Sequence, residues 1–164
     1  VEDNIMSVLE MTGKPRAYQL EKLESLIKDF DLQKVRKNLG DQLSGGERRR
    51  VEIARCLAND PKFIMLDEPF AGVDPIQVEE IQHIVWKLKY RNIGILITDH
   101  NVDETLTITD RAYLLFEGRI LFQGTPEELA ENKTVKEKYL TTSFVLRKKD
   151  FQLLDEQKKA RDKE

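Results

Sequence analysis

A chain of 164 residues with 40% hydrophobic and 35% charged residues has the composition of one globular unit with a modest core. The formal net charge of −3 gives no reason to expect nucleic acid as a partner, and a single cysteine excludes an internal disulfide framework. Two histidines and that cysteine are too few for a typical zinc site, and no apolar run approaches the roughly 20 residues of a membrane span. We therefore expect a cytosolic protein that reaches a membrane only through partners.

The first forty residues predict two helices. Ile5, Val8 and Leu9 follow helical spacing, and because the printed sequence enters this pattern without a methionine, we expect an internal start. Thr12-Gly13 predicts a break, after which a second helix is expected to turn an apolar stripe toward the core. That stripe consists of Leu20, Leu23, Leu26, Ile27 and Phe30.

The run Leu43-Ser44-Gly45-Gly46-Glu47 predicts the start of a third helix. Ser44 suits the N-cap position, and Glu47 stands three residues later, where its carboxylate can reach back in a capping box. A helix N-terminus attracts anions, and the two glycines would let a phosphate approach the backbone N–H groups closely. We expect this helix to end at Asn59-Asp60-Pro61.

The apolar residues 63–66, followed by Asp67-Glu68-Pro69, predict a buried parallel strand whose carboxyl end opens into a site. Two adjacent acids at such an end suit magnesium and water. One carboxylate could hold the ion and the other could accept a proton from an attacking water.

Asp74-Pro75 predicts the N-cap and first position of a long helix, and residues 93–98 predict the next buried strand. The order strand, helix, strand favours parallel strands, whose carboxyl ends meet at one edge of a sheet. We therefore expect the Asp67-Glu68 pair and His100 to share that edge.

The rest of the chain predicts smaller elements and a charged tail. The elements are a short helix at 102–106, a hairpin with strands 111–116 and 119–122 joined at Glu117-Gly118, a helix opened by a second capping box at Thr125 and Glu128, and a helix near 135–140. Residues 147–164 are mostly charged, so we expect an exposed helix or disorder.

Four motifs occur in a fixed order along the chain: residues 43–47, the strand ending in Asp67-Glu68, Ala71-Gly72-Val73-Asp74, and Thr98-Asp99-His100. In this order they resemble the signature motif, the Walker B strand, the D-loop and the switch-histidine loop of ABC transporter nucleotide-binding subunits. The amino-acid sequences of segments 46–55, 67–75 and 97–102 are most similar to those of the ATPases of lipopolysaccharide export. The resemblance runs from about residue 1 to residue 146.

The resemblance implies an α/β fold, a P-loop NTPase-like (RecA-like) ABC ATPase core with a parallel sheet plus an α-helical subdomain. We expect residues 1–60 to form the helical signature subdomain, 61–146 the C-terminal part of the core, and 147–164 the tail. The printed sequence has no G-x-x-x-x-G-K-[ST] pattern, since its only Gly-Lys pair, Gly13-Lys14, precedes Pro15. We therefore expect the second half of a nucleotide-binding domain, in which strand 93–98 pairs on one side and leaves the other edge open.

The resemblance also implies ATP and Mg²⁺ as ligands. By it, Asp67 would hold magnesium through water, Glu68 would be the general base, and His100 would contact the γ-phosphate. Catalysis of this kind works by positioning and electrostatics.

The signature residues would act on a second nucleotide. Ser44, Gly45 and Gly46 would bind the γ-phosphate held by the opposing subunit of a homodimer, and Asp74 of the D-loop belongs to the same nucleotide site. Glu47 stands where many family members have glutamine, and because a carboxylate near a phosphate is unfavourable, we expect it to turn back into the capping box.

The implied function is an ATP-hydrolysing subunit that powers lipopolysaccharide export, bound through transmembrane permease subunits to the cytoplasmic face of the inner membrane, with no nucleic acid. One alternative is the ATPase of a branched-chain amino-acid importer, although such importers tend to carry Glu where this chain has Asp99. Another is a non-transport ABC protein, which would need a basic surface or a long coiled-coil insertion.

Overall fold

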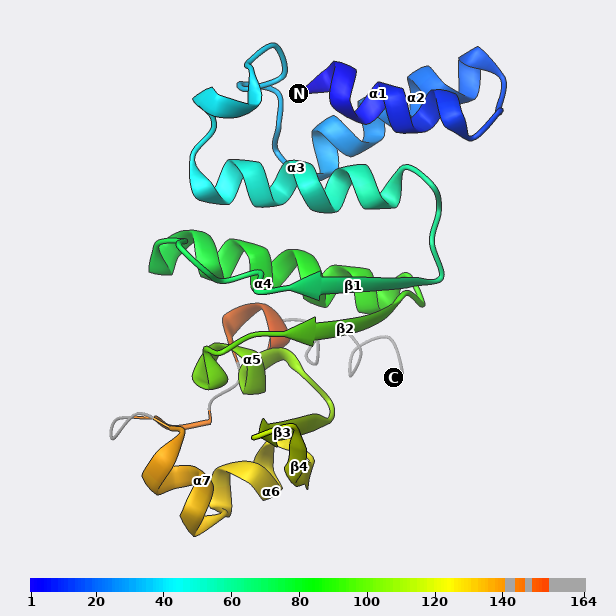
Figure 1. The fold of residues 1–164 in the computed structure, drawn as a ribbon. Coiled ribbons are helices and arrows are strands. Elements are labelled where there is room, and N and C mark those ends of the chain that lie inside the picture. The colour runs from blue at the N-terminus through cyan, green and yellow to red at the C-terminus, as the bar shows by residue number, and fades with distance from the viewer. Residues whose placement is uncertain (141–143, 147–148, 154–164) are drawn as a thin grey trace, which may run out of the picture. The chain divides into compact units, whose positions relative to one another are not determined.

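The computed structural model describes residues 1–140, 144–146 and 149–153, and Figure 1 labels their elements. The chain divides into two compact units, Val1–Thr98 and Asp99–Glu164. In the described ranges, no helix is both long and apolar enough to cross a membrane.

Three helices form the first part of the Val1–Thr98 unit: α1 (Glu2–Met11), α2 (Arg16–Asp29) and α3 (Gly45–Leu57). They pack against one another in every pairing, as the two predicted apolar stripes require. Their shared core includes Ile5, Leu9, Leu23, Leu26, Ile27, Ile53, Ala54 and Leu57. Each buried aliphatic side chain of this kind contributes about 1.5–3 kcal/mol. The prediction for Leu20 was wrong: its side chain is 46% exposed, because it lies at the edge of the stripe.

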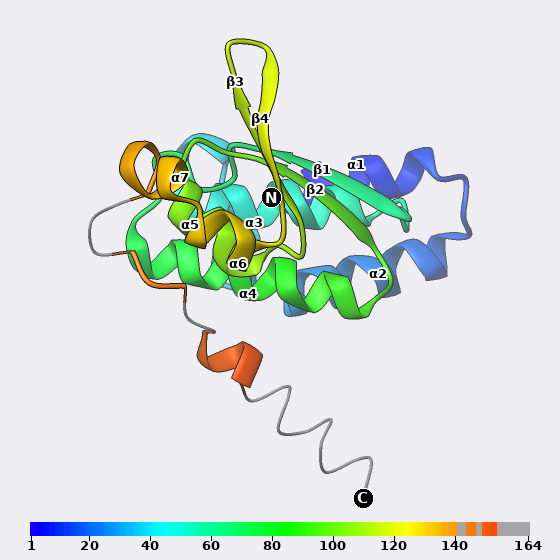
Figure 2. The same ribbon diagram turned by 90° about the horizontal axis from the view of Figure 1, so that it is seen from below.

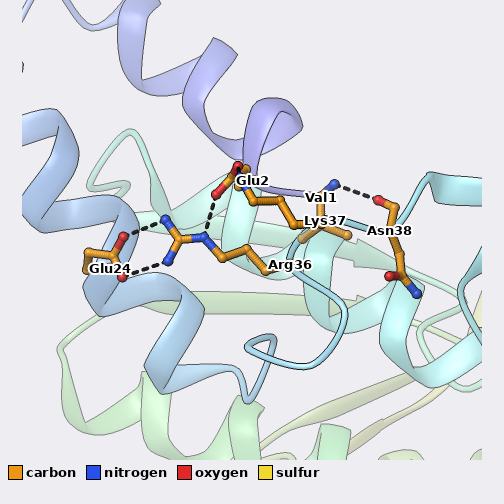
Figure 3. A network of polar contacts seen from close by, with 6 residues as sticks. All are labelled: Val1, Glu2, Glu24, Arg36, Lys37 and Asn38. Atoms are coloured by element: carbon orange, nitrogen blue, oxygen red, sulfur yellow. Dashed lines mark hydrogen bonds and ion pairs between the residues drawn. The ribbon is translucent and has the colours of Figure 1, made fainter.

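A network of charged side chains ties the start of α1 to α2 and to the segment before α3 (Figure 3). The Arg36 guanidinium donates to both oxygens of Glu24, at 2.9 and 2.6 Å, and through Nε to Glu2. Lys37 also pairs with Glu2. The hydrogen bonds from Lys37 and then Arg36 lower the pKa of Glu2 to about 2.

The second part of this unit is built on two parallel strands, β1 (Phe63–Asp67) and β2 (Gly94–Thr98), connected by α4 (Pro75–Tyr90). The register pairs Phe63 with Gly94 and Asp67 with Thr98, so the two carboxyl ends lie side by side. The predicted parallel pair is therefore confirmed. Among the described residues β2 pairs with β1 alone, which agrees with the expected open edge.

The prediction that both strands are buried was wrong on one face. Along β1 only alternate residues are buried, and Phe63 and Met65 are exposed, while β2 contains no fully buried residue. Figure 2 shows α4 along one face of these strands, and α3 packs on α4. A strand that carries helices on one face alternates between buried and exposed side chains, whereas a doubly covered strand does not.

The Asp99–Glu164 unit contains α5 (Val102–Ile108), β3 (Ala112–Phe116) and β4 (Arg119–Gly124). The strands form the predicted antiparallel hairpin, with an irregularity between Leu114 and Leu115. Its turn residues, Glu117 and Gly118, have φ of 47° and 74°. Two successive left-handed residues give the turn whose twist matches that of the hairpin strands.

Two short helices follow, α6 (Pro126–Glu131) and α7 (Lys133–Lys138), as the sequence predicts. Of the predicted tail at 147–164, only 149–153 lies inside the described residues, and 150–153 is helical. Here the expectation of an exposed segment was wrong for Gln152, which is buried and donates from Nε2 to the Thr107 carbonyl at 3.1 Å. Lys149 also lies 3.8 Å from Glu104.

Candidate functional site

The N-terminus of α3 has the predicted capping box. The Glu47 N–H donates to Ser44 Oγ at 3.2 Å, and the Ser44 N–H donates to Glu47 Oε2 at 2.9 Å. These hydrogen bonds from Ser44 lower the pKa of Glu47. The prediction that Glu47 turns back into the cap is confirmed, so its carboxylate is engaged with the N-terminus of its own helix.

Of the two glycines at this helix start, Gly45 lies against the segment between β1 and α4, and Gly46 lies against the first turn of α4. A Cβ on Gly45 would lie 3.1 Å from the Gly72 carbonyl oxygen. A Cβ on Gly46 would lie 2.6 Å from Cδ and 2.9 Å from Cβ of Gln77, which is closer than side-chain atoms normally approach. Glycine is therefore required at Gly46 by packing within this chain, in addition to any role toward a phosphate.

Gln77 is a functional candidate that the sequence reasoning missed. Its Oε1 accepts the Gly46 N–H at 2.8 Å, the same backbone donor that the sequence assigns to a phosphate. The only signal in the sequence was its place three residues after the N-cap Asp74, where a side chain of α4 can reach back toward the preceding loop.

Asp74 caps α4. Its Oδ1 accepts the N–H groups of Ile76 and Gln77, each at 3.1 Å, and Pro75 occupies the first helical position as predicted. The backbone of Gln77 is thus tied to Asp74 while its side chain is tied to Gly46. This pair of contacts joins the start of α4 to the start of α3.

Asp67 is the last residue of β1 and Glu68 follows it, and both are exposed. The Thr98 hydroxyl donates to Asp67 Oδ1, so a residue of β2 orients this carboxylate. Glu68 has φ of 45°, and its N–H donates to the Thr98 carbonyl at 2.7 Å. Its own carbonyl accepts from the Ala71 N–H at 3.2 Å and from Arg49 Nη2 at 2.9 Å. The chain turns sharply at Glu68 and is held there by its neighbours.

His100 belongs to the Asp99–Glu164 unit, just before α5. Its side chain is 72% exposed, and Nδ1 lies 3.8 Å from Asp99 Oδ1. The same Asp99 oxygen accepts the Asn101 N–H at 2.8 Å, and Asn101 caps α5. His100 therefore extends from a hydrogen-bonded turn, and its place beside the Asp67-Glu68 edge stays a prediction.

The residues of the first unit fit a phosphate and a hydrated cation. The described part of the chain contains no group of three or more His, Cys, Asp or Glu side chains that could hold a metal by themselves. Magnesium does not need such a cage, because it keeps several waters and binds through one or two carboxylates plus substrate phosphates. The exposed, oriented carboxylate of Asp67 meets that requirement.

Comparison with known proteins shows to which family the chain is similar. The ABC transporter family model matches residues 1–71. The lipopolysaccharide export system ATP-binding protein LptB of Haemophilus influenzae is 52% identical over 147 residues, covering 89% of this chain. The chain belongs to the ABC ATPase family.

Other relatives differ in name at similar identity. LptB of Escherichia coli is 49% identical over 147 residues, and a probable ABC transporter ATP-binding protein of Azorhizobium caulinodans is 52% identical over 146 residues. Each alignment covers 89% of this chain but 61% and 52% of the respective relative. This ABC ATPase chain thus spans little more than half the length of the proteins it matches.

Solved structures agree on the fold. An ATP-binding cassette of an ABC transporter superimposes with a TM-score of 0.69 at 32% identity, over 78% of this chain and 53% of the other. An ADP conformation of an ATP-binding cassette gives a TM-score of 0.67 at 28% identity, over 82% and 60%. The predicted α/β, P-loop NTPase-like fold with a parallel sheet is confirmed for this ABC ATPase chain.

Proposed function

We propose that the protein is the ATP-binding and ATP-hydrolysing subunit of an ABC transporter that powers lipopolysaccharide export from the inner membrane. The observation that carries the proposal is the first unit's constellation: a glycine-rich helix start against the loop after Asp67 and Glu68, with both acids exposed. The identities of 52% and 49% to LptB proteins support lipopolysaccharide as the cargo.

The two acids have separate roles. Asp67, oriented by Thr98, would hold Mg²⁺ through its water shell, and the ion when bound neutralises phosphate charge. Glu68 would accept the proton of the water that attacks the γ-phosphate. Its exposure supports this role, because a general base must reach a water that is itself in line with the leaving phosphate.

The signature residues act on the nucleotide of a second subunit. The hydroxyl of Ser44 and the backbone of Gly45 and Gly46 would bind the γ-phosphate held by the P-loop of the opposing copy, so two subunits close over two nucleotides. Because Gln77 accepts the Gly46 N–H, a phosphate oxygen at that donor must displace the Gln77 amide. Asp74 supports the site by fixing the start of α4 beside it.

His100 would contact the γ-phosphate, which its exposure permits. Transmembrane permease subunits would hold the protein at the cytoplasmic face of the inner membrane. The P-loop that anchors the nucleotide has no counterpart in residues 1–164, so this chain alone should not turn over ATP.

The decisive variant is Glu68→Gln in the full-length protein. It should bind ATP normally and lose turnover by about 10²- to 10⁴-fold, the contribution of a general base, while accumulating as a nucleotide-bound dimer. Glu79→Gln on the exposed side of α4 is the matched control and should keep normal turnover. Near-normal ATPase activity of Glu68→Gln would remove Glu68 from this role.

The cargo is tested separately from hydrolysis. Purification with the membrane subunits, followed by ATP-driven lipopolysaccharide release from proteoliposomes, should succeed with the wild-type protein and fail with Glu68→Gln. Co-purification with an amino-acid permease instead, or with ribosomes, would retain the ATPase proposal and replace the cargo.

A further inference from the structure

The candidate general base is fixed through its backbone by a residue outside the described ATP chemistry. Arg49 lies in the first turns of α3, and its Nη2 donates to the Glu68 carbonyl oxygen at 2.9 Å. This hydrogen bond joins residues 19 positions apart and connects α3 with the loop after β1.

The Glu68 backbone needs such a contact. Its φ of 45° is in the left-handed region, which costs a non-glycine residue free energy and persists only when neighbouring groups over-determine it. Such groups include Thr98 of β2, whose carbonyl accepts the Glu68 N–H, and two donors to the Glu68 carbonyl, the Ala71 N–H and Arg49. The Thr98 and Ala71 contacts are backbone hydrogen bonds, whereas the Arg49 contact is made by a side chain of α3.

Arg49 is itself held in place. Its Nη1 donates to Glu52 Oε2 at 2.8 Å, one turn later on α3, and its side chain is 23% exposed. A guanidinium presents several donors in a rigid fork, so one nitrogen can be anchored by Glu52 while the other reaches Glu68. The flanking arginines point elsewhere: Arg50 pairs with Glu80 of α4, and Arg48 is exposed.

We infer that Arg49 is a positioning residue that sets the orientation of Glu68, and so couples the signature helix to the general base of the same chain. The inference rests on the proposed function. In a dimer that closes over two nucleotides, α3 faces one nucleotide and Glu68 the other, so a shift of α3 on phosphate binding moves the Arg49 contact and with it Glu68. The test depends only on the hydrogen bond between Arg49 and Glu68 of the same chain.

The test measures kcat and KM for ATP in the full-length protein. Arg49→Ala should lower kcat about 10-fold with KM changed less than about twofold, because a charge-assisted hydrogen bond of this scale is lost while the nucleotide contacts remain. Arg49→Lys keeps a charged donor and should recover part of kcat. Arg48→Ala, the neighbouring arginine, should behave as wild type.

A double-mutant cycle separates positioning from general stabilisation of the fold. If Arg49 acts through Glu68, Arg49→Ala should cause no further loss in the Glu68→Gln background under single turnover. An additive loss, a wild-type kcat for Arg49→Ala, or a loss confined to KM would each overturn the inference. If Glu68→Gln itself retains turnover, Glu68 is not the general base and the inference about Arg49 is overturned with it. If Glu68→Gln loses turnover and Arg49→Ala keeps a wild-type kcat, the inference alone is overturned.

Discussion

Two helices of this chain begin with the same capping box, and only one of them has the surroundings of a ligand site. At α3, Ser44 and Glu47 exchange hydrogen bonds of 2.9 and 3.2 Å. At α6, Thr125 and Glu128 exchange hydrogen bonds of 2.8 and 3.2 Å. The local geometry is the same, so the capping box by itself predicts a helix start and nothing more.

The surroundings of the two boxes are different. After Ser44 come two glycines, which lie against Gly72 and Gln77 from a distant loop and helix. After Thr125 comes Pro126, which has no backbone N–H that could donate to a ligand. Gly124, which precedes Thr125, packs against Glu128 of the same capping box. An anion site at a helix start needs donors that a ligand can approach, and only α3 keeps them.

The largest expected effect on dimer closure comes from filling the space beside Gly46. Gly46→Ala would place a Cβ 2.9 Å from the Gln77 Cβ, so α3 and α4 must separate there. ATP-driven dimer closure should weaken by about 100-fold, because the displaced helix start no longer holds its N–H donors in the orientation that a phosphate needs. Titration of dimer formation against ATP by size-exclusion chromatography measures it.

Gly40→Ala is the control for Gly46→Ala, because a Cβ there would meet nothing within 4 Å. The Gly40→Ala variant should show the same ATP-driven dimer closure as wild type. Equal weakening of closure in both variants would mean that helical propensity or general stability, rather than the space at Gly46, controls the dimer.

Local sequence patterns predicted the parts of the fold that local energies decide. Both capping boxes, the Asp74-Pro75 helix start and the Glu117-Gly118 hairpin turn follow from side chains within a few residues of one another. Sequence order also predicted the parallel pairing of β1 and β2, because a helical crossover leaves little alternative.

Sequence could not predict contacts made between distant elements. The place of Gln77 three residues after Asp74 does not indicate that its side chain accepts the N–H of Gly46, 31 residues away. Likewise, the pattern around Arg49 does not indicate that its side chain binds the Glu68 carbonyl, 19 residues away. The exposed face of β1 was missed for a related reason. An apolar run indicates that a strand can be buried, but whether both faces of the strand are buried depends on which other elements cover them.

The next prediction compares the two caps directly. Ser44→Ala and Thr125→Ala should each cost about 1 kcal/mol of stability, because each removes the acceptor of one helix N–H. Only Ser44→Ala should also weaken ATP-driven closure, by about 10-fold, since its hydroxyl would donate to a charged phosphate. Thermal melting and dimer titration of both variants give the two readouts.

If Ser44→Ala melts lower but closes like wild type, its hydroxyl is a cap alone and the distinction between the two boxes disappears. If Thr125→Ala closes poorly as well, the loss follows from stability and Ser44 has no separate role.

A smaller effect is expected from Gln77. Because its Oε1 occupies the Gly46 N–H, Gln77→Ala should free that donor and tighten ATP-driven closure about 3- to 10-fold, the worth of one neutral hydrogen bond that no longer has to be broken. The neighbouring Ile76→Ala, at an exposed position, is the control. Weaker closure of Gln77→Ala would show that the Gln77 amide holds the helix start in its binding shape rather than competing for it.

The smallest effect concerns the charge of Glu47. The hydrogen bonds from Ser44 hold the pKa of Glu47 below its ordinary value of 4.5, so the folded protein releases this proton more readily than the unfolded chain. The resulting stabilisation is fully present above the unfolded pKa and is lost as pH falls through the lower, folded pKa.

Glu47→Gln can keep an oxygen acceptor for the Ser44 N–H but cannot titrate, so the melting temperature of the variant should fall less than that of wild type between about pH 5 and pH 3. The Glu2→Gln variant is the comparison: with a folded pKa of about 2, Glu2 should lose its contribution over a wider range that extends to lower pH. A Glu47→Gln melting curve that runs parallel to wild type through this range would mean that the capping carboxylate gains nothing from its charge, and that the α3 box depends on hydrogen-bond geometry alone.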